Sequence, residues 1–556
     1  MNDKKIFRIL INRINVGFDA CEDEIFSSAK KKFKRLAPSV DLGTLHLSIY
    51  KKSIDARKRD DIRAVYSVLA ELECRGNIPK GLGDKIDPAE FRILGGDEES
   101  DICVDSFGEE KTVYPPVVVG MGPAGMFCAL LLAENGYKPI IIDRGDSVAD
   151  REASVSKFYR DKILDTESNI QFGAGGAGTF SDGKLITRIN DKHCNYVLRR
   201  LCEFGAPDDI TLSARPHIGT DVLRDVVNRI LNRIEELGAT VIYRCRLDGI
   251  SENSDSTLTL KTSRGDICAS SAVLALGHSA RDTYEMLIRY GLSIRPKPMS
   301  VGVRVEHLRS DIDKAMYGRF AGHPLLGSAE YNLSDTSRER GVYTFCMCPG
   351  GEVVAAASEQ GELAVNGMSR RARDGANSNS AVAVSVFPTD YGKFEGNDAL
   401  GAIEYQRRIE RAAFAAGGSD WKAPVQTLGD FLGLSSSSLH EPTRVLPSYM
   451  GGNGHYRVAD ISSVFPEYVV SSLRQGFSSF ERKIKGFSAH DAIITAAETR
   501  TSAPVRIERD ADLCAIGHNM IYPCGEGAGY AGGITSAALD GVKVALALMK
   551  RFAPNG

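Results

Sequence analysis

The sequence has no apolar run that approaches the roughly 20 residues needed to span a lipid bilayer. Residues 1–19 are basic but have neither a long apolar core nor a cleavage site, so we predict no signal peptide. The formal net charge of −3 gives no overall attraction to nucleic acid or to an anionic membrane. We therefore expect a cytoplasmic protein with no membrane span, and we do not expect nucleic acid as a partner.

Cysteine motifs are missing as well. The twelve cysteines are scattered and form no C-x-x-C, which suits a reducing compartment better than a disulfide framework. No group of histidine and cysteine has the spacing of a zinc site, so we predict no metal. What is present is an ordinary globular composition, with 43% hydrophobic and 25% charged residues. A length of 556 residues is enough for two to four domains.

The most informative stretch is Val117–Gly145. It reads as a short apolar strand, a G-x-G-x-x-G turn, an apolar helix that ends at Asn135-Gly136, and a second strand that leads into Asp143. A lone G-x-G-x-x-G is weak because the chain has 55 glycines. Here the strand, the turn, the helix, the second strand and the acidic residue follow one another in the order that a dinucleotide-binding motif requires. This order favours a dinucleotide site over a glycine-rich turn without a ligand.

Each part of this stretch has a physical role. Gly120 permits the tight turn, Gly122 lets a pyrophosphate approach the backbone, and Gly125 lets the helix pack close to the sheet. The helix N-terminus offers unpaired N–H groups to the phosphates. Asp143 is expected to accept hydrogen bonds from both ribose hydroxyls of an adenosine, although its side chain is shorter than the glutamate that is commoner there.

A second glycine-rich segment, residues 169–188, follows one predicted helix later. Five glycines lie between Gly173 and Gly183, so the segment exposes many backbone N–H groups and lets a flat ligand approach. We favour a cofactor contact over a flexible surface loop.

A third segment follows a strand near the C-terminus, where Gly525 and Glu526 precede the turn Gly532-Gly533 and a helix of small residues. That acid is expected to bind a ribityl or ribose hydroxyl, and the helix N-terminus is expected to stabilise negative charge near the flavin.

The middle of the chain connects these segments. Residues 215–237 read as an amphipathic helix with a Thr220/Asp221 capping signal. A strand, a small antiparallel meander and the buried strand Ala272–Leu276 follow, and Gly277 ends them. An FAD-type domain has this order and a simple NAD domain does not. Short alternating segments then fill residues 294–487 and predict an inserted, largely β substrate or cap domain.

Residues 1–110 predict a separate small α+β domain of β-α-β-β order, joined by the linker Gly95–Val113. Residues 1–72 carry 15 Lys/Arg against 10 Asp/Glu. This bias could mark a surface for RNA or an acidic partner, but we favour the solvated faces of a small domain. The predicted fold class is therefore α/β: a Rossmann-like FAD-binding domain, with a parallel sheet and a β-meander, in the two parts 111–293 and 488–556, plus the inserted domain 294–487 and the domain 1–110.

These segments together resemble the FAD-binding flavoproteins of the glutathione-reductase type. More narrowly, the chain is similar to the bacterial family of FAD-dependent dehydrogenases described as "NAD(FAD)-utilizing dehydrogenases". The matching blocks are SIDARKRD at 53–60, GMGPAG at 120–125, IIDRG at 141–145, FGAGGAGTFSDGKL at 172–185, RPHIGTD at 215–221, LALGHSARDT at 274–283, CMCPGG at 346–351, NGMS at 366–369 and CGEGAGYAGGITSAALDG at 524–541. The resemblance covers nearly the whole chain and implies FAD, but it supplies no substrate.

Only a few residues are candidates for a catalytic role. We name His217, His278 and Arg281 as candidate catalytic residues; a structural histidine and a surface salt bridge are the alternatives. Cys346 and Cys348 could form a redox pair, but a disulfide at this spacing would be strained and we favour packing. No C-x4-C lies near the flavin segments, which argues against a disulfide reductase. No second G-x-G-x-x-G has strand and helix context, so NAD(P)H is expected at most as a transient electron donor.

The sequence therefore predicts an FAD-dependent oxidoreductase that transfers hydride between flavin N5 and an unidentified small molecule. The alternatives are an RNA-directed flavoenzyme that uses the basic N-terminal domain, and a non-catalytic FAD-binding redox sensor. The residues expected to bind FAD are Gly120, Gly122, Pro123, Ala124, Gly125, Asp143, Arg144, Gly176, Ala177, Gly178, Thr179, Ser181, Lys184, Leu247, Gly277, Gly525, Glu526, Gly532, Gly533 and Ile534.

Overall fold

The computed structural model describes residues 4–36, 45–75, 89–94, 106–187, 191–434 and 439–554, with single residues at 38, 87, 102, 104 and 189. The predicted linker Gly95–Val113 therefore lies partly outside the described residues. The chain divides into two compact units. The first comprises Met1–Cys103, Arg188–His217 and Asp313–Ala329, and the second comprises Val104–Thr187, Ile218–Ile312 and Glu330–Gly556.

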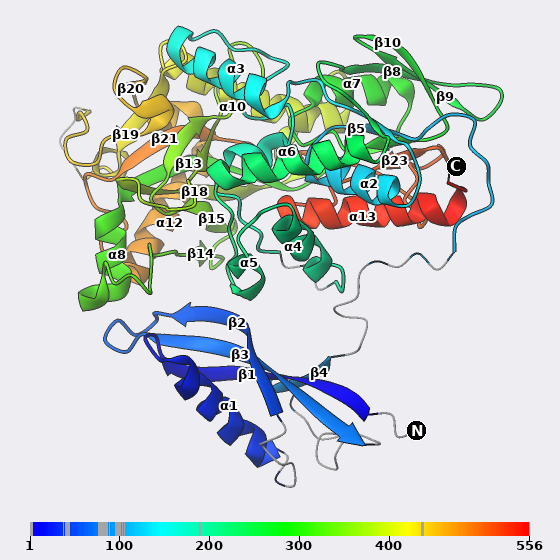
Figure 1. The fold of residues 1–556 in the computed structure, drawn as a ribbon. Coiled ribbons are helices and arrows are strands. Elements are labelled where there is room, and N and C mark those ends of the chain that lie inside the picture. Colours follow the sequence, from blue (N-terminus) through cyan, green and yellow to red (C-terminus); the bar gives the residue numbers. More distant parts are fainter. Residues whose placement is uncertain are drawn as a thin grey trace. The chain divides into compact units, whose positions relative to one another are not determined.

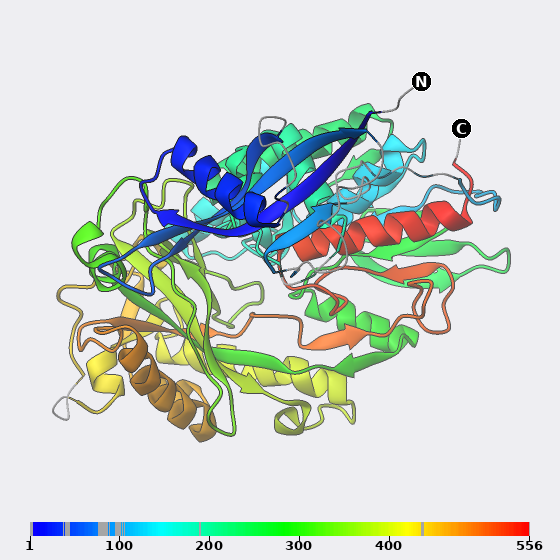
Figure 2. The same ribbon diagram turned by 90° about the horizontal axis from the view of Figure 1, so that it is seen from below.

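The first unit is built on an antiparallel sheet of order β2-β3-β1-β4. Helix α1 (Glu22–Leu36) packs against β1 and β3, as Figure 1 and Figure 2 show. Its buried residues Ile25, Ala29 and Phe33 recur every four positions, which places one apolar face on the sheet. The remaining elements are β1 (Lys4–Gly17), β2 (Leu45–Asp55), β3 (Arg63–Arg75), β4 (Phe91–Leu94), α4 (Cys194–Glu203), α5 (Asp209–Leu212) and η4 (Gly318–Phe320). The predicted β-α-β-β order is observed, with β4 added.

The second unit contains a five-stranded parallel sheet of order β23-β11-β5-β6-β7. Its strands are β5 (Val117–Val119), β6 (Ile140–Ile142), β7 (Thr240–Ile242), β11 (Ala272–Leu274) and β23 (Ile521–Pro523). Every residue of β5, β11 and β23 is buried, which explains why these strands read as unbroken apolar runs. The pairing of β23 with β11 brings the C-terminal glycine-rich segment to the same sheet as the first one.

Two helices pack side by side next to this sheet: α2 (Pro123–Glu134) and α13 (Ile534–Arg551) (Figure 1). Glycine is what allows the close contact. A Cβ atom at Gly541 of α13 would lie 2.0 Å from the carbonyl oxygen of Ala124 in α2. A Cβ atom at Gly125 would lie 1.9 Å from the carbonyl oxygen of Gly120, so the glycine-rich turn and α2 pack as tightly as the motif predicts. Helix α6 (Thr220–Glu236) also contacts α2.

Smaller elements complete this part of the second unit. The predicted meander is a three-stranded antiparallel sheet of order β10-β9-β8. The elements are α3 (Val148–Asp161), η3 (Gly176–Phe180), β8 (Leu247–Glu252), β9 (Leu258–Thr262), β10 (Gly265–Ala269), α7 (Arg281–Tyr290) and the antiparallel pair β12 (Ile294–Pro296) and β22 (Val505–Ile507). Among the described residues, no helix is both long enough and apolar enough to cross a membrane.

The largest sheet has seven strands in the order β14-β15-β18-β13-β21-β19-β20, antiparallel except for the last pair. Its strands are β13 (Met299–Leu308), β14 (Ser334–Asp335), β15 (Val342–Cys348), β18 (Asn377–Val386), β19 (Ala423–Thr427), β20 (Tyr456–Val458) and β21 (Ile493–Glu498). Around it lie the hairpin β16 (Glu352–Ala355) and β17 (Val365–Met368), and the helices α9 (Pro388–Tyr391), α10 (Asp398–Ala416), α11 (Leu428–Phe431), η5 (Tyr449–Gly451), η6 (Ile461–Val464) and α12 (Glu467–Lys483). Helix α8 (Arg309–Tyr317) follows β13 in the chain, and the division between the two units falls within it. Because β21 pairs with β13 and β19, this sheet extends past the predicted boundary at 487.

The structure confirms a mixed α/β fold with parallel and antiparallel sheets, but one local prediction is wrong. Thr220 and Asp221 do not cap α6. The N-cap residue is Gly219, with φ +86° and no side-chain cap. The Thr220 hydroxyl instead donates to the carbonyl oxygen of Thr179 (2.6 Å), and Asp221 accepts the N–H of Arg371 (2.8 Å). Both side chains therefore fasten other segments to the start of the helix.

Candidate cofactor site

The three glycine-rich segments that the sequence singled out meet at one place. The N-cap residues of α2 and α13 are Gly122 and Gly533, and neither helix has a side-chain cap. Helix η3 lies against both ends. A Cβ atom at Gly176 would be 3.0 Å from Cα of Gly122, and one at Gly178 would be 3.1 Å from Cγ1 of Ile534. Two helix N-termini, whose first N–H groups have no partner within the helix, therefore lie on either side of η3.

Open space adjoins the two N-termini. A Cβ atom added at Gly277, Gly532 or Gly533 would meet no heavy atom within 4 Å apart from its chain neighbours. At Gly122 the nearest heavy atom would be 3.9 Å away. The glycines at these positions are therefore not required by packing within the protein, in contrast to Gly120 and Gly125. Their lack of a side chain leaves room for something that approaches the backbone.

Asp143 makes two backbone hydrogen bonds that the sequence did not predict. One carboxylate oxygen accepts the N–H of Met121 (2.8 Å) and the other accepts the N–H of Gly145 (2.8 Å). The side chain is buried. Asp143 thus fastens the end of β6 to the glycine-rich turn, and ribose binding by its remaining lone pairs stays a prediction. Its neighbour Arg144 is ion-paired with Glu167 and Asp282.

The loop around η3 is held in place by its own polar groups. The Ser181 hydroxyl donates to the carbonyl oxygen of Gly178 (2.7 Å), and the Thr179 hydroxyl donates to Ala174 (3.3 Å). Lys184 forms an ion pair with the buried Asp182 (Nζ to Oδ2, 3.6 Å). The predicted surface-loop alternative does not describe this segment, because most of residues 169–185 are buried.

Glu526 lies next to the start of α13. Its carboxylate accepts the N–H of Gly533. Burial raises the pKa of Glu526 to about 7, and the ammonium group of Lys297 opposes that shift. A carboxyl group whose pKa lies near neutral can both release and accept a proton at physiological pH. The predicted contact residue Glu526 is therefore also a candidate acid or base.

Arg281 lies in a buried ionic network rather than at an open surface. Its guanidinium donates to Glu410 (2.7 and 2.9 Å), Glu359 (2.8 Å), Glu362 (3.1 Å) and Gln406 (3.1 Å). The arginine is 1% exposed. These contacts favour a structural role for Arg281 over the predicted catalytic one, because carboxylates already occupy donors at both of its terminal nitrogens.

His278 is buried directly after Gly277. Its Nδ1 lies 3.0 Å from the hydroxyl of Ser279. Burial lowers the pKa of His278 to about 3, and the nearby guanidinium groups of Arg500 and Arg281 act in the same direction. The imidazole is therefore neutral at pH 7 and can exchange hydrogen bonds, but it does not carry a charge there.

This depressed pKa predicts acid lability. The unfolded chain takes up a proton at His278 below pH 6.5 while the folded chain does not, so stability present above pH 6.5 is lost as the pH falls toward 3. Between pH 6.5 and pH 5 the loss from this residue is about 2 kcal/mol. We expect His278→Asn to reduce the difference in unfolding free energy between pH 7 and pH 5, measured by chemical denaturation. His490→Asn, at an exposed histidine of the same unit, is the control. Equal pH dependence in wild type and His278→Asn would contradict the assignment.

Two predicted residues are not brought to the site by the described geometry. Leu247 is buried at the start of β8, where it pairs with Thr262. His217 is the last residue of the segment Arg188–His217, which belongs to the first unit. Its catalytic role remains a prediction.

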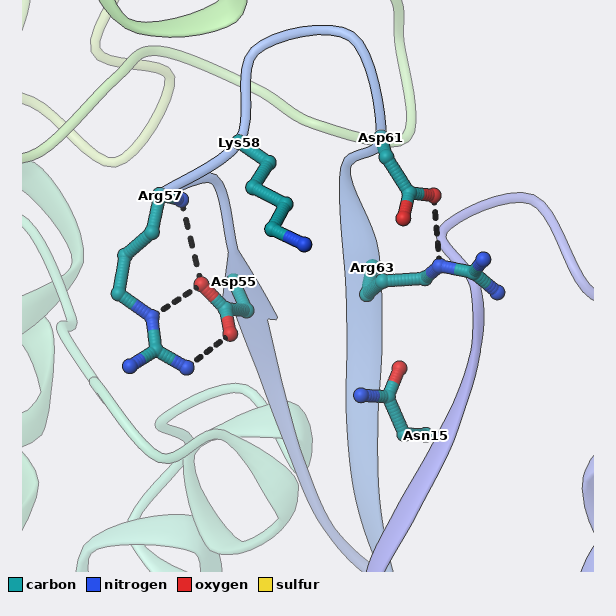
Figure 3. A pocket seen from close by; sticks show the side chains of 6 residues that line it. All are labelled: Asn15, Asp55, Arg57, Lys58, Asp61 and Arg63. Atoms are coloured by element: carbon teal, nitrogen blue, oxygen red, sulfur yellow. Dashed lines mark hydrogen bonds and ion pairs between the residues drawn. The ribbon is translucent and has the colours of Figure 1, made fainter.

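The first unit has a cavity of its own, of about 660 Å³. It is lined by Asn15, Asp55, Arg57, Lys58, Asp61 and Arg63 (Figure 3). Arg57 forms an ion pair with Asp55 (2.5 Å) and Arg63 with Asp61 (2.7 Å), while Lys58 extends from the loop into the space between the strands. Because both arginines face carboxylates, the cavity is of mixed charge and does not favour the RNA alternative.

Sequence reasoning missed a set of charged residues near the η3 loop. Asp182 accepts hydrogen bonds from Arg373 (2.5 and 3.0 Å) and from the Ser369 hydroxyl. Arg304 and Glu498 form a fully buried ion pair (2.8 Å) between adjacent strands β13 and β21. Charged residues that pair across two different strands leave no recognisable pattern within a short stretch of sequence. The one signal available was a charged residue inside an otherwise apolar strand, as at Arg304 in Met299–Leu308.

Comparison with known proteins places this geometry in context. Residues 298–501 match the family model "FAD-dependent protein, C-terminal domain-like". FixC of Escherichia coli (strain K12) is 24% identical over 199 residues, which cover 36% of this chain and 44% of FixC. Among solved structures, CtdE in complex with FAD has a TM-score of 0.31 at 11% identity, covering 78% of this chain and 84% of CtdE. Glycine oxidase from Geobacillus kaustophilus has a TM-score of 0.32 at 11% identity, covering 79% of this chain and 95% of that one. These TM-scores are too low to support a conclusion.

One relative matches over the whole length. A protein of Clostridium beijerinckii described as "Uncharacterized protein" is 45% identical over 547 residues, which cover 98% of this chain and 99% of the clostridial one. The matched region includes all three glycine-rich segments and residues 298–501. The chain therefore belongs to one family with this clostridial protein, and its residues 298–501 match the model of the FAD-dependent protein C-terminal domain.

Proposed function

We propose that the chain is an FAD-dependent oxidoreductase that transfers hydride between the flavin and a small-molecule substrate. The observation that carries the proposal is the pair of helix N-termini without side-chain caps, at Gly122 and Gly533, with open space beside them. The FAD-dependent domain at 298–501 supports the choice of FAD among dinucleotides.

The residues present fit this cofactor. A pyrophosphate needs backbone N–H donors, a favourable helix dipole and no Cβ in its path, and the start of α2 offers all three. An extended dinucleotide also needs contacts beyond its pyrophosphate, and the start of α13, next to η3, supplies them. We assign the pyrophosphate to Gly120–Gly125, and the other half of the cofactor to the η3 loop and to Gly532–Ile534.

FAD, when bound, supplies two-electron redox chemistry at its flavin ring. The protein's own groups stabilise charge, hold or release a proton, and form hydrogen bonds. The α13 N-terminus stabilises negative charge on whatever lies before it. Glu526 holds or releases a proton beside that N-terminus, since its pKa is about 7. Neutral His278 keeps an imidazole nitrogen available for hydrogen bonding next to Gly277 without adding positive charge.

The experiment that tests the proposal is an absorbance spectrum of the purified protein, with and without added FAD. It is followed anaerobically by NADH and then NADPH. We expect a bound flavin with visible absorbance bands. Bleaching by one nicotinamide would identify the electron donor, and persistent bands would favour a substrate-driven dehydrogenase.

Two results would redirect the assignment. A protein that takes up no FAD even after reconstitution would contradict the proposal at its base. A protein that binds FAD but whose flavin is reduced by neither nicotinamides nor a panel of amines, hydroxy acids and amino acids would instead support the non-catalytic redox-sensing role.

A further inference from the structure

The sequence block SIDARKRD at 53–60 belongs to the first unit, whereas the three glycine-rich segments belong to the second. It forms the end of β2 and most of the loop that joins β2 to β3. Together with neighbouring positions on β1 and at the start of β3, this block surrounds the cavity of about 660 Å³. The lining residues, in chain order, are Asn15, Asp55, Arg57, Lys58, Asp61 and Arg63.

The strands bring three of these residues to one face of the sheet. Arg63 on β3 pairs with both Asp55 on β2 and Gly17 on β1, and Asn15 lies two residues before Gly17. Side chains alternate between the two faces along a strand, and cross-strand partners share a face. Asn15, Asp55 and Arg63 therefore point to the same side. The next residue, Ala64, is fully buried on the opposite face, so the cavity lies away from the core that Ala64 joins.

The opposite charges on the two strands do not neutralise each other across the cavity. Asp55 and Arg63 are direct cross-strand partners, a position at which opposite charges stabilise a sheet by pairing. Asp55 instead accepts hydrogen bonds from Nε (2.8 Å) and a terminal nitrogen (2.5 Å) of Arg57. Arg63 pairs through Nε with Asp61 (2.7 Å). Each strand end is thus paired with a residue of the adjoining loop, and the space between the two pairs stays open (Figure 3).

Hydrogen-bond donors remain available in this space. Lys58 extends into it from the loop, and neither Lys58 nor the side chain of Asn15 bonds another lining residue (Figure 3). Arg63 uses only its Nε toward Asp61, so its two terminal nitrogens keep their donors. An ammonium and a guanidinium group donate hydrogen bonds and accept none. Three cationic side chains face two carboxylates in the lining, which leaves one net positive charge.

The lining restricts the kind of ligand that fits. All six side chains are polar or charged, which disfavours an apolar or flat aromatic molecule. The volume lies in the range of small-molecule sites and leaves room for more than a single inorganic ion. Asp55 and Asp61 repel a polyanion, whereas one oxyanion group can bind the Lys58 ammonium and the planar fork of Arg63.

We propose that this cavity binds a small polar organic anion through a carboxylate or phosphate group. Lys58 and Arg63 hold that group, and the Asn15 amide bonds a second polar group of the same molecule. The Arg57–Asp55 pair fixes the loop that carries Lys58. Every residue involved belongs to the first unit, so the inference does not depend on the proposed function.

The test is isothermal titration calorimetry of the full-length protein with citrate, sn-glycerol 3-phosphate and a short oligouridylate. FAD is kept in excess, so that the added anions do not occupy the helix N-termini of the second unit. We expect one molecule of citrate or of glycerol phosphate to bind per chain with a Kd of about 1 mM or lower, and the tighter of the two identifies the anionic group. If neither saturates the protein below about 10 mM, or if the oligouridylate binds more tightly than both, the proposal is wrong.

Variants locate the binding site. Lys58→Met and Arg63→Met should each weaken anion binding by about tenfold or more, the loss expected for a hydrogen bond to a charged group. Lys31→Met, at an exposed lysine of α1, removes the same charge elsewhere in this unit and should bind like the wild type. Lys58 and Arg63 are exposed, so the variants should keep the far-UV circular dichroism of the wild type. Equal affinities of Lys58→Met and Lys31→Met would show that the anion binds somewhere else.

Discussion

Gly122→Ala is expected to weaken FAD binding by about 100-fold or more while leaving the protein folded. A Cβ atom at this position would have its nearest heavy atom 3.9 Å away, so the protein itself accommodates alanine. The same methyl group would stand where a pyrophosphate approaches the N-terminus of α2. Losing about two hydrogen bonds to a charged group costs roughly 3 kcal/mol or more, which corresponds to that loss of affinity. Quenching of flavin fluorescence on titration of FAD with apo-protein measures it.

The matched control is Gly249→Ala in β8, where the new methyl group would meet only the flexible side chain of Lys261, at 3.5 Å or more. This variant should bind FAD as the wild type does. Both variants should have the thermal midpoint of the apo wild type. A folded Gly122→Ala protein with undiminished affinity would show that the cofactor does not lie over this turn.

Glu410→Gln is expected to destabilise the second unit by about 3–5 kcal/mol. Glu410 is completely buried. It accepts hydrogen bonds from Arg281 (2.7 and 2.9 Å), Arg500 (2.9 and 3.2 Å) and the Thr499 hydroxyl (2.5 Å). Removing its charge leaves two buried guanidinium groups with too little compensating charge, and that penalty is larger than the net value of an intact pair. Chemical denaturation of the apo-protein, followed by far-UV circular dichroism, measures the change.

Glu404→Gln, on the same helix α10, is the control that separates the effect of burial on stability from the effect of removing a charge. Glu404 pairs with Arg411, whose side chain is 49% exposed, so this change should cost less than about 1 kcal/mol. If the two variants lose equal stability, the buried network is no stronger than a surface pair, and the structural role given to Arg281 would have to be withdrawn.

Local sequence patterns predicted the strand and helix around the first glycine-rich turn well because their signals are contiguous. The strand, turn and helix of Val117–Glu134 follow one another directly, and each depends on neighbours a few residues away. Helix α12 (Glu467–Lys483) was not predicted, since its serines and Gly476 lower helix propensity. Its serine hydroxyls bond back to the helix, as Ser472 does to Tyr468 (2.7 Å), and its buried residues Leu473, Phe477 and Phe480 pack against the sheet. Tertiary packing, which no local window contains, decides this helix.

Side-chain roles were harder to predict than elements. Asp143 occupies the predicted position at the end of β6, but the sequence could not reveal that Met121 and Gly145 already use both of its oxygens. Arg281 was named as a candidate catalytic residue, with a surface salt bridge as the alternative. Its buried network could not be predicted, because the three carboxylate partners lie about 80 or 130 residues further along the chain. The partners of Arg281 are therefore remote in sequence, whereas Asp143 bonds one residue 22 positions away and another two positions away.

The position of β23 and α13 has a consequence for the order of events during synthesis. β23 pairs with β11 and α13 packs on α2, although α13 leaves the ribosome about 400 residues after α2. At about 5–20 residues per second, the first glycine-rich turn waits tens of seconds for the second helix N-terminus that completes the site. During that interval the apolar face of α2 lacks its partner, so the growing chain exposes aggregation-prone surface for which a chaperone or early pairing must compensate. Under the proposed function, in which FAD lies over both helix N-termini, the site for the cofactor is complete only at the final stage of folding.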